Sequence, residues 1–460
     1  MHARTAASEA IAFARRSDVR RRWLDQLAAL VAIPSVSSDA ARRQDIRDAA
    51  TFLRRHCDAI GLDATVLPGE QGGAPSVFAE RRTRTRGPTI LFYGHYDVQP
   101  PGARSVWRTP PFDPIIKGGR IIGRGTTDDK GQLFAHLAAI ESWLASTQTL
   151  PVGVKVWLEG EEELGSPTLP FVLDRHIARL RADGVVISDT EMMAEDVPAI
   201  VYGLRGIVSS DLHVAGPRRS VHAGRYGGAI RNPLEVVAEI ITSLHSPDGR
   251  IAIAGFYDDV RAASPRERFA LRASMSGDEA LKAEFAVGPF GDPHFSTAER
   301  IAIRPALIVT AVWAGDAAEK AGIPRRACAR VTARIVPDQN AIRVADLIRA
   351  HVAAVTPADV RAHVATRVAS PPVLLPVQHP IIDAAARAVR RVWGKPPPFV
   401  RSGGSIPVAG QFHARLCAPV VLLGFGKPVD GAHAPNESLA LNRFFSAIET
   451  IIQFIAECAA

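Results

Sequence analysis

The chain of 460 residues has little cysteine, few aromatic residues and no long hydrophobic run. Its four cysteines (Cys57, Cys328, Cys417 and Cys458) lack CxxC spacing, which excludes a cysteine-based zinc finger and a disulfide scaffold and suits a reducing compartment. No apolar run approaches the roughly 18 residues of a membrane span. The N-terminal region also lacks the apolar core of a secretory signal, so we expect a cytoplasmic protein without a membrane partner.

Basic residues are in slight excess, with 55 lysines and arginines against 47 acidic residues and a formal net charge of +8. Five arginines cluster near the N-terminus, at Arg15, Arg16, Arg20, Arg21 and Arg22. Such a cluster is compatible with a nucleic-acid surface, but no aromatic residues are interleaved with it as base-stacking platforms would be. We therefore expect a solvated face of an amphipathic helix and no nucleic-acid partner.

The composition is that of a folded protein with more than one domain. Hydrophobic residues make up 47% and charged residues 22% of the chain, which excludes a disordered chain. Up to residue 206, strand-like runs at 89–93, 152–158 and 184–188 alternate with helix-like segments, including 132–145, whose large apolar residues share one face. This alternation predicts an α/β domain with a largely parallel sheet.

After Gly206 the pattern changes. Residues 207–214 and 329–336 are typical of strands with one polar face, because in the second run Val331, Ala333 and Ile335 alternate with polar residues. The remaining expected segments are loops and short helices over 258–295, a linker at 368–373, a helix at 380–393, a strand at 419–424 and a C-terminal helix from 441. The sequence therefore predicts an α/β domain of residues 1–206 and 373–460, interrupted by an inserted α+β domain of residues 207–372.

Five places in the chain carry acidic residues or histidine next to an expected strand or loop, four of them together with glycine. They are GHYDV (94–98), GTTDDKG (125–131), EGEEELGS (159–166), SDT (188–190) and DGAH (430–433). Four of the five follow an apolar strand directly or lie a few residues beyond one. Because ligands of open α/β sheets bind just beyond the carboxyl ends of the strands, we expect these side chains to converge on one edge of the sheet.

Convergence would gather five carboxylates in one pocket, from Asp97, Asp128, Glu162, Glu163 and Asp189. Like charges that close cannot all stay ionised without compensation. Two divalent cations would supply it, and a pair of metals roughly 3.5–4 Å apart is a hydrolytic arrangement. Nitrogen and oxygen donors without thiolate fit Zn²⁺, with Mn²⁺ or Co²⁺ as alternatives.

Each motif alone also has a plainer interpretation. A histidine beside an aspartate is often a buried hydrogen-bonded pair, a run of glutamates is usually a solvated face, and paired aspartates can cap a helix. The joint pattern, with four of the five motifs containing glycine, favours the metal site.

These motifs resemble those of the M20 family of dinuclear zinc peptidases, and within it the branch of carnosine dipeptidase and cytosolic non-specific dipeptidase. The likeness runs from LVAIPSVS (30–37) to the C-terminal helix. It is carried by GHYDVQPPG (94–102), GRGTTDDKGQ (123–132), EGEEELGS (159–166), YGLRG (202–206), GGSIP (403–407) and DGAHAPNE (430–437). The resemblance implies that the inserted domain is a lid and dimerisation domain.

The resemblance also implies a set of metal ligands. His95 and Asp189 would bind one metal, Glu163 and His433 the other, and Asp128 would bridge both. The Asp128–Asp129 peptide bond would be cis.

The remaining roles follow from the same resemblance. Asp97 would orient His95, and Glu162 would be the general base that takes a proton from the activated water and passes it to the leaving amine. His222, in SVHAG, would reach the active site of a partner subunit and so imply a homodimer. Arg334 would bind the substrate carboxylate and Ser405 would add a contact; their plainer interpretations are a surface histidine, a surface arginine and a turn residue.

The implied activity is metal-dependent hydrolysis of dipeptides. Aspartate at position 189 accompanies dipeptidases and aminopeptidases in relatives, whereas glutamate accompanies carboxypeptidases and acyl-amino-acid hydrolases. Animal members read KTVIP where this chain reads KAGIP (320–324), so a substrate-contacting threonine is absent. An amidohydrolase of N-acyl or N-carbamoyl amino acids is the alternative on the same scaffold. A catalytically inactive metal-binding scaffold would lack a ligand or the base, and none is missing.

Overall fold

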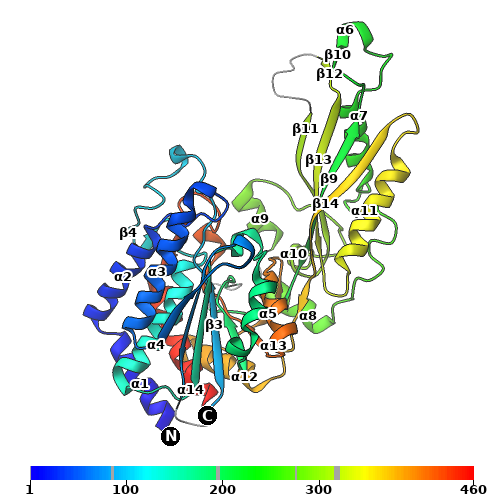
Figure 1. Ribbon diagram of the computed structural model, residues 1–460. Helices are drawn as coiled ribbons and strands as arrows, with labels where there is room; N and C mark the ends of the chain where they lie inside the picture. Colours follow the sequence, from blue (N-terminus) through cyan, green and yellow to red (C-terminus); the bar gives the residue numbers. More distant parts are fainter. Residues whose placement is uncertain (1, 84–86, 193–196, 275–276, 315–321) are drawn as a thin grey trace. The chain divides into compact units, whose positions relative to one another are not determined.

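The computed structural model describes residues 2–83, 87–192, 197–274, 277–314 and 322–460 (Figure 1). They form two compact units. The first runs to Tyr202 and resumes at Leu375–Phe399 and Val408–Ala460, and the second comprises Gly203–Leu374 and Val400–Pro407. The sequence placed the boundaries after residues 206 and 372, and the return of 400–407 to the second unit has no counterpart in that prediction.

The first unit is built on a sheet in the order β1-β2-β6-β3-β7-β17-β8. These strands are β1 (Asp63–Leu67), β2 (Ser76–Arg81), β6 (Gly153–Glu159), β3 (Thr89–His95), β7 (Gly184–Ile187), β17 (Val420–Leu422) and β8 (Ile200–Leu204). The central pairs are parallel and the flanking pairs antiparallel. A small antiparallel sheet contains β4 (Ile115–Lys117), β5 (Arg120–Ile122) and β18 (Ser438–Ala440). The predicted α/β class with a mostly parallel sheet is confirmed.

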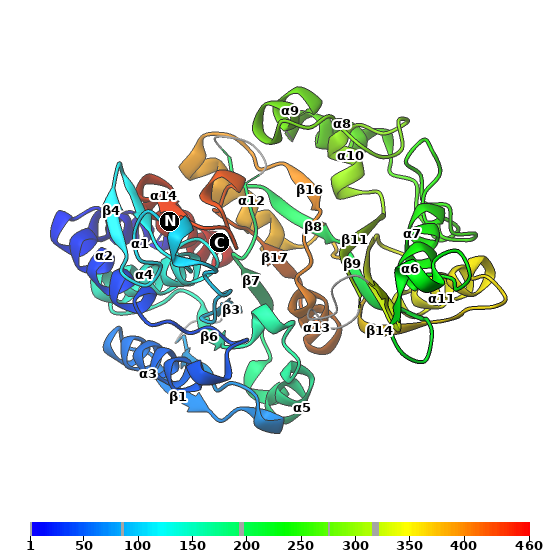
Figure 2. The ribbon, with the colours of Figure 1, turned by 90° about the horizontal axis from the view of Figure 1, so that it is seen from above.

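Helices cover both faces of this sheet because the central strands are apolar on both sides. Neighbouring residues of β3 show this: Phe92 contacts His136 and Phe454, whereas Tyr93 contacts Phe412. Seen from above, α1, α4 and α14 lie on one side of β3 and β7, and α13 on the other (Figure 2). The helices are α1 (His2–Ala14), α2 (Ser17–Val31), α3 (Arg43–Ala59), α4 (Lys130–Thr147), α5 (Leu169–Leu180), α12 (Pro380–Trp393), α13 (Pro407–Leu416) and α14 (Leu441–Cys458).

Helix α4 is buried on all sides over Lys130–Trp143, not only along its stripe of large apolar residues. The opposite side carries the small residues Ala135, Ala138, Ala139 and Ser142, all buried. α1, α2 and α14 pack against α4, which in turn packs on β3. The sequence pattern showed only one face because alanine and serine carry a weak hydrophobic signal.

Arg20, Arg21 and Arg22 lie on α2, whereas Arg15 and Arg16 lie in the short connection between α1 and α2, so the cluster does not form the face of one helix as the sequence predicted. Several of them are paired with acids: Arg15 with Glu449 at 2.7 Å and Arg22 with Glu141 at 2.7 Å. The cluster therefore helps to hold α1 and α2 to the rest of the unit. Across the described ranges, no helix is both long enough and apolar enough to cross a bilayer.

The second unit contains an antiparallel sheet in the order β11-β13-β9-β14. Val331, Ala333 and Ile335 of β13 lie in its core, as the alternation predicted, and α7 and α11 pack on this sheet. Its elements are β9 (Gly206–Ala215), β10 (Val221–His222), α6 (Ala223–Tyr226), α7 (Pro233–Ser243), α8 (Pro265–Ser274), α9 (Asp278–Phe285), α10 (Thr297–Ala302), β11 (Ala306–Ala314), β12 (Gly322–Ile323), β13 (Arg326–Ile335), α11 (Ala341–Val355), β14 (Arg361–Ser370) and β15 (Val373–Leu374), with β16 (Phe399–Ser402) at the return.

The linker predicted at 368–373 is wrong for its first half. Residues 368–370 are the end of β14, paired with Ile207–Ser209 of β9. β14 is an edge strand with mostly exposed side chains, so it has little apolar pattern, and the prolines at 371 and 372 dominated the local signal.

Candidate metal centre

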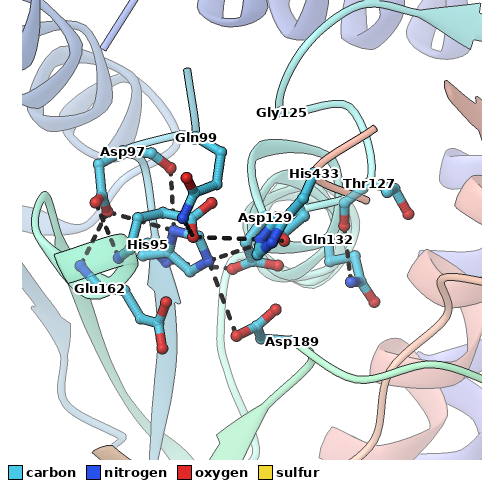
Figure 3. A network of polar contacts seen from close by, with 12 residues as sticks. His95, Asp97, Gln99, Gly125, Thr127, Asp129, Gln132, Glu162, Asp189 and His433 are labelled. Atoms are coloured by element: carbon cyan, nitrogen blue, oxygen red, sulfur yellow. Dashed lines mark hydrogen bonds and ion pairs between the residues drawn. The ribbon is translucent and has the colours of Figure 1, made fainter. Parts of the chain in front are cut away.

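The carboxyl ends of parallel strands bring the predicted ligands together in the first unit. His95 is the last residue of β3 and pairs with Glu159, the last residue of β6, just before Glu162 and Glu163. Asp189 lies two residues beyond the end of β7, the strand on the other side of β3. Asp128 lies two residues before the first residue of α4, and its Oδ1 is 3.1 Å from His95 Nε2. His433 follows β17 by a loop and approaches the same edge of the sheet (Figure 3).

Two groups of donor atoms result. One consists of His95, Glu162 and Asp189, and the other of Asp128, Glu163 and His433; within each group the donor atoms lie within 4.8 Å of one another. The Asp128 carboxylate faces both groups. Its Oδ1 lies 3.1 Å from His95 Nε2, and its Oδ2 lies 2.8 Å from His433 Nε2. A carboxylate with one oxygen toward each histidine is placed as a bridge between two cations would be.

Asp97 organises two of the ligand segments. Its Oδ1 accepts a hydrogen bond from the backbone N–H of Glu162 and its Oδ2 from that of Glu163, both at 3.1 Å. His95 Nδ1 lies 3.3 Å from Asp97 Oδ1 and 3.1 Å from its carbonyl oxygen. These contacts hold the imidazole so that Nε2 points toward Asp128 and, at 3.8 Å, toward Asp189.

The backbone around Asp128 is unusual and closely packed. The Asp128–Asp129 peptide bond is cis, as the resemblance implied. Asp129 Oδ2 accepts a hydrogen bond from the backbone N–H of His95 at 3.2 Å. A Cβ atom at Gly94 would lie 2.6 Å from Leu133 Cβ and 2.9 Å from Asp129 Oδ2, so glycine is required where β3 passes α4.

Many acidic side chains lie close together in this pocket. Burial raises the pKa of Glu162 to about 8, and the charges of Asp97 and Asp128 act in the same direction. Burial and the charge of Asp128 raise the pKa of Asp189 well above its ordinary value. Hydrogen bonds to Asp128 and Glu163 raise the pKa of His433 to about 10. Each shift shows a pocket that favours added positive charge.

The donor set fits divalent cations. It consists of imidazole nitrogens and carboxylate oxygens without thiolate. Among the residues that the structure describes, the buried Glu163 Oε1 has no hydrogen-bond partner, although an unpaired buried carboxylate oxygen is costly. Its other oxygen, Oε2, lies 3.2 Å from His433 Nε2.

The comparisons with known proteins agree with this geometry. The model of peptidase family M20/M25/M40 matches residues 91–457. The chain belongs to peptidase family M20/M25/M40. It is 31% identical to the Cys-Gly metallodipeptidase dug1 of Schizosaccharomyces pombe over 95% of each chain. Its fold is similar to that of the di-peptidase Dug1p from Saccharomyces cerevisiae, with a TM-score of 0.86, 26% identity and 98% of each chain covered. It is also similar to human carnosine dipeptidase 1, with a TM-score of 0.84, 26% identity and coverage of 98% of this chain and 99% of that one.

Glu437 is a residue of this M20 site that the sequence reasoning missed. Its buried carboxylate accepts hydrogen bonds from the backbone N–H groups of Gly125, Thr127 and Asp128 at 2.9, 2.9 and 3.1 Å. It also accepts one from Arg124 Nη1 at 2.7 Å. Because Glu437 lies four residues after His433, it ties the loop of one ligand to the loop of another. The sequence feature that could have identified Glu437 is its position as the last residue of the DGAHAPNE motif (430–437).

Residues of the 30–37 motif form hydrogen bonds with the segments that carry the metal ligands. The fully buried Lys130 donates to the carbonyl oxygens of Leu30 and Ile33 at 3.0 and 2.6 Å. Ser35 Oγ donates to the carbonyl oxygen of Tyr96 at 2.6 Å. This segment therefore holds both the Asp128 loop and the residues after His95.

The other predicted site residues belong to the second unit. His222 is exposed at the end of β10, which pairs with β12. Arg334, on β13, donates from Nη1 to Ser405 Oγ at 3.0 Å, so the structure brings these two together. Lys320 and Ala321 of the KAGIP segment lie outside the described residues.

We predict that Glu437→Gln weakens both the fold and the metal centre. Loss of the charge leaves Arg124 buried without its partner, so the free energy of unfolding should fall by about 3 kcal/mol. Metal affinity should fall ~10–100-fold, as for other residues that support ligands. Urea unfolding and metal titration check this, with Glu9→Gln on the exposed side of α1 as control. Unchanged affinity and stability in the Glu437 variant would contradict the role.

Proposed function

We propose that this M20 peptidase is a metal-dependent dipeptidase. The observation that carries the proposal is the pair of donor groups that meet at the two oxygens of Asp128. The metallodipeptidase relatives, which match along nearly the whole chain, support this activity rather than a purely structural use of the metals.

In this proposal His95 and Asp189 hold one divalent cation, Glu163 and His433 hold the other, and Asp128 is shared. The nitrogen and oxygen donors suit Zn²⁺, and Mn²⁺ and Co²⁺ are the alternatives. When bound, the cations supply positive charge that activates water and polarises a carbonyl group. Asp97 keeps His95 oriented and fixes the backbone of Glu162 and Glu163.

Glu162 is proposed as the general base and then the general acid. It takes a proton from the attacking water and delivers it to the amine that leaves as the peptide bond breaks. Its position supports this role, since its carboxylate lies within 4.8 Å of donor atoms of His95 and Asp189 while its backbone is held by Asp97. Arg334 and Ser405 are proposed as substrate contacts.

A substrate panel tests the activity itself. We expect purified protein loaded with Zn²⁺, Mn²⁺ or Co²⁺ to hydrolyse dipeptides such as Cys-Gly and β-Ala-His, and a chelator to abolish the reaction. The same assay includes N-acetyl and N-carbamoyl amino acids. Cleavage of those compounds alone would replace the dipeptidase by the amidohydrolase, and no cleavage of any compound would favour the inactive scaffold.

Glu162→Gln is expected to lower kcat by ~10²–10⁴-fold, because proton transfer is lost while the shape of the side chain is kept. Metal content should stay at the wild-type level. The matched control is Glu161→Gln, whose carboxylate instead accepts from the backbone N–H groups of Ala74 and Thr168 at 3.0 and 2.9 Å, and it should retain most of the activity. Full turnover by the Glu162 variant would remove it from the mechanism.

The protein is further proposed to be a cytoplasmic homodimer. All four cysteines are free thiols, which suits a reducing compartment. The exposed position of His222 in the second unit is compatible with a contact across a dimer. In that arrangement His222 serves the metal centre of the partner subunit.

Mixing two inactive variants tests this arrangement. If His222 acts in the partner, subunits carrying Glu162→Gln and subunits carrying His222→Ala form heterodimers with one intact site. Unfolded together and refolded as a mixture, they should recover about a quarter of wild-type activity, whereas each variant alone stays inactive. Sedimentation gives the oligomeric state in parallel. Activity of His222→Ala alone at the wild-type level would remove the shared site.

A further inference from the structure

A cysteine and two histidines lie next to one another on three adjacent strands of the second unit's sheet. Cys328 of β13 is the register partner of His213 of β9, and His213 is also the register partner of His363 of β14. Register partners on neighbouring strands share a face of the sheet, with Cβ atoms about 4.5–5.5 Å apart. The three side chains therefore form one row across the sheet, termed the Cys-His-His row.

This row lies on the face of the sheet opposite to the hydrophobic core of the unit. Ala327 and Ala329, on either side of Cys328, belong to that core, and α7 and α11 pack on the sheet there. Because successive side chains of a strand alternate between faces, Cys328 and its register partners point the other way. Cys328 is nevertheless only 3% exposed, while His213 is half-buried and His363 exposed. The row thus runs from a buried sulfur to an exposed imidazole.

Two of the three donors are already in contact. Cys328 Sγ lies 3.3 Å from His213 Nδ1, which in the metal-free protein is a thiol–imidazole hydrogen bond. A metal ion held by both atoms at a tetrahedral angle, with bonds of ~2.3 Å to sulfur and ~2.0 Å to nitrogen, would place them about 3.5 Å apart. The pair therefore needs very little movement to bind an ion.

His363 offers a third donor at the exposed end of the row. Its ring stacks on that of His213, with 4.7 Å between the ring centroids and 12° between the ring planes. Burial lowers the pKa of His213, and the charges of His363 and Arg326 act in the same direction. His213 is therefore held as the neutral imidazole, which is the form that binds metals. Rotation of the exposed His363 ring would direct one of its nitrogens to an ion bound by its neighbours.

The charged neighbours of the row restrict the kind of ion. Asp211, two residues before His213 on the same face, is paired with Arg330 and Arg367, each at 2.8 Å. Arg326, two residues before the cysteine on β13, adds a further positive charge. One carboxylate among three guanidinium groups leaves the surroundings positive, which opposes a divalent cation more than a monovalent one.

We propose that the Cys-His-His row binds a monovalent copper ion. Thiolate sulfur and imidazole nitrogen are donors that suit Cu⁺. As the copper–sulfur bond forms, the Cys328 thiol releases its proton to solvent, so that Cu⁺ and thiolate together add no net charge. The bound ion would link β13 to β9 and, through His363, to β14. This site goes beyond the proposed dipeptidase activity and uses none of the residues of the carboxylate-rich centre.

A copper titration tests the site. Protein first loaded with Zn²⁺ is titrated with Cu⁺ under a reductant that contains no thiol, in competition with a coloured Cu⁺ chelator. We expect the wild-type chain to withdraw about one Cu⁺ from the chelator, and X-ray absorption at the copper edge to show sulfur together with nitrogen. Cys328→Ser should abolish this uptake, and His213→Gln should weaken it at least about tenfold. Cys417→Ser, which removes an exposed free thiol, is the matched control and should bind as wild type does.

Three results would overturn the proposal. Absence of uptake by the wild-type chain would leave the contact between Cys328 and His213 as a hydrogen bond only. Equal loss of uptake in Cys417→Ser, or full uptake by both His213→Gln and His363→Gln, would indicate adventitious binding to a thiol. Displacement of the copper by excess Zn²⁺ would overturn the choice of ion.

If Cys328→Ser fails to fold, the two histidine variants decide by the same competition. A loss of affinity in His213→Gln with a smaller loss in His363→Gln supports the site, because His213 already contacts the sulfur. The measurement uses no substrate, so its result is independent of whether the protein cleaves dipeptides.

Discussion

The concentration of carboxylates at one edge of the first unit's sheet is the constraint on which the rest of this structure depends. Asp128, Glu162, Glu163 and Asp189 are brought together by strands whose burial leaves them little freedom. Burial and mutual repulsion raise the pKa of Glu162 and Asp189, so the pocket is far more favourable with cations than without. Because so many buried carboxylates repel one another, their placement in one pocket indicates that the pocket binds metal ions.

Hydrogen bonds from the surrounding residues hold these carboxylates in place despite their mutual repulsion. Asp97 holds one side of His95 and the backbone of Glu162 and Glu163, while Glu437 holds the backbone at Asp128. Lys130 binds the end of the 30–37 segment to the same loop. Three ligand segments from distant parts of the chain are thereby joined through hydrogen bonds between side chains and backbone groups, which tolerate little displacement.

Charge of the opposite sign gathers in the second unit. Arg205 and Arg334 share the hydroxyl of Ser405 and have no acid beside them in the described residues.

Much of the fold was predictable from the sequence because its signals are local. Continuous apolar runs predicted β3, β6 and β7, and the alternation of Val331, Ala333 and Ile335 predicted the buried face of β13. The edge strand β14 escaped prediction because an exposed edge carries little apolar pattern. The burial of α4 on its alanine side escaped for a similar reason, since small residues pack well without a strong hydrophobic signal.

The sequence by itself determined which residue types were available, and that glycine-flanked acids and histidines followed strands in a pattern typical of M20 peptidases. Only the tertiary structure decided that each oxygen of Asp128 faces a different histidine, that Glu437 clamps the loop before α4, and that Arg205 shares Ser405 with Arg334. The physical reason is that hydrogen bonds and charge pairs act over a few ångströms, whereas the residues that form them are separated by up to hundreds of positions along the chain.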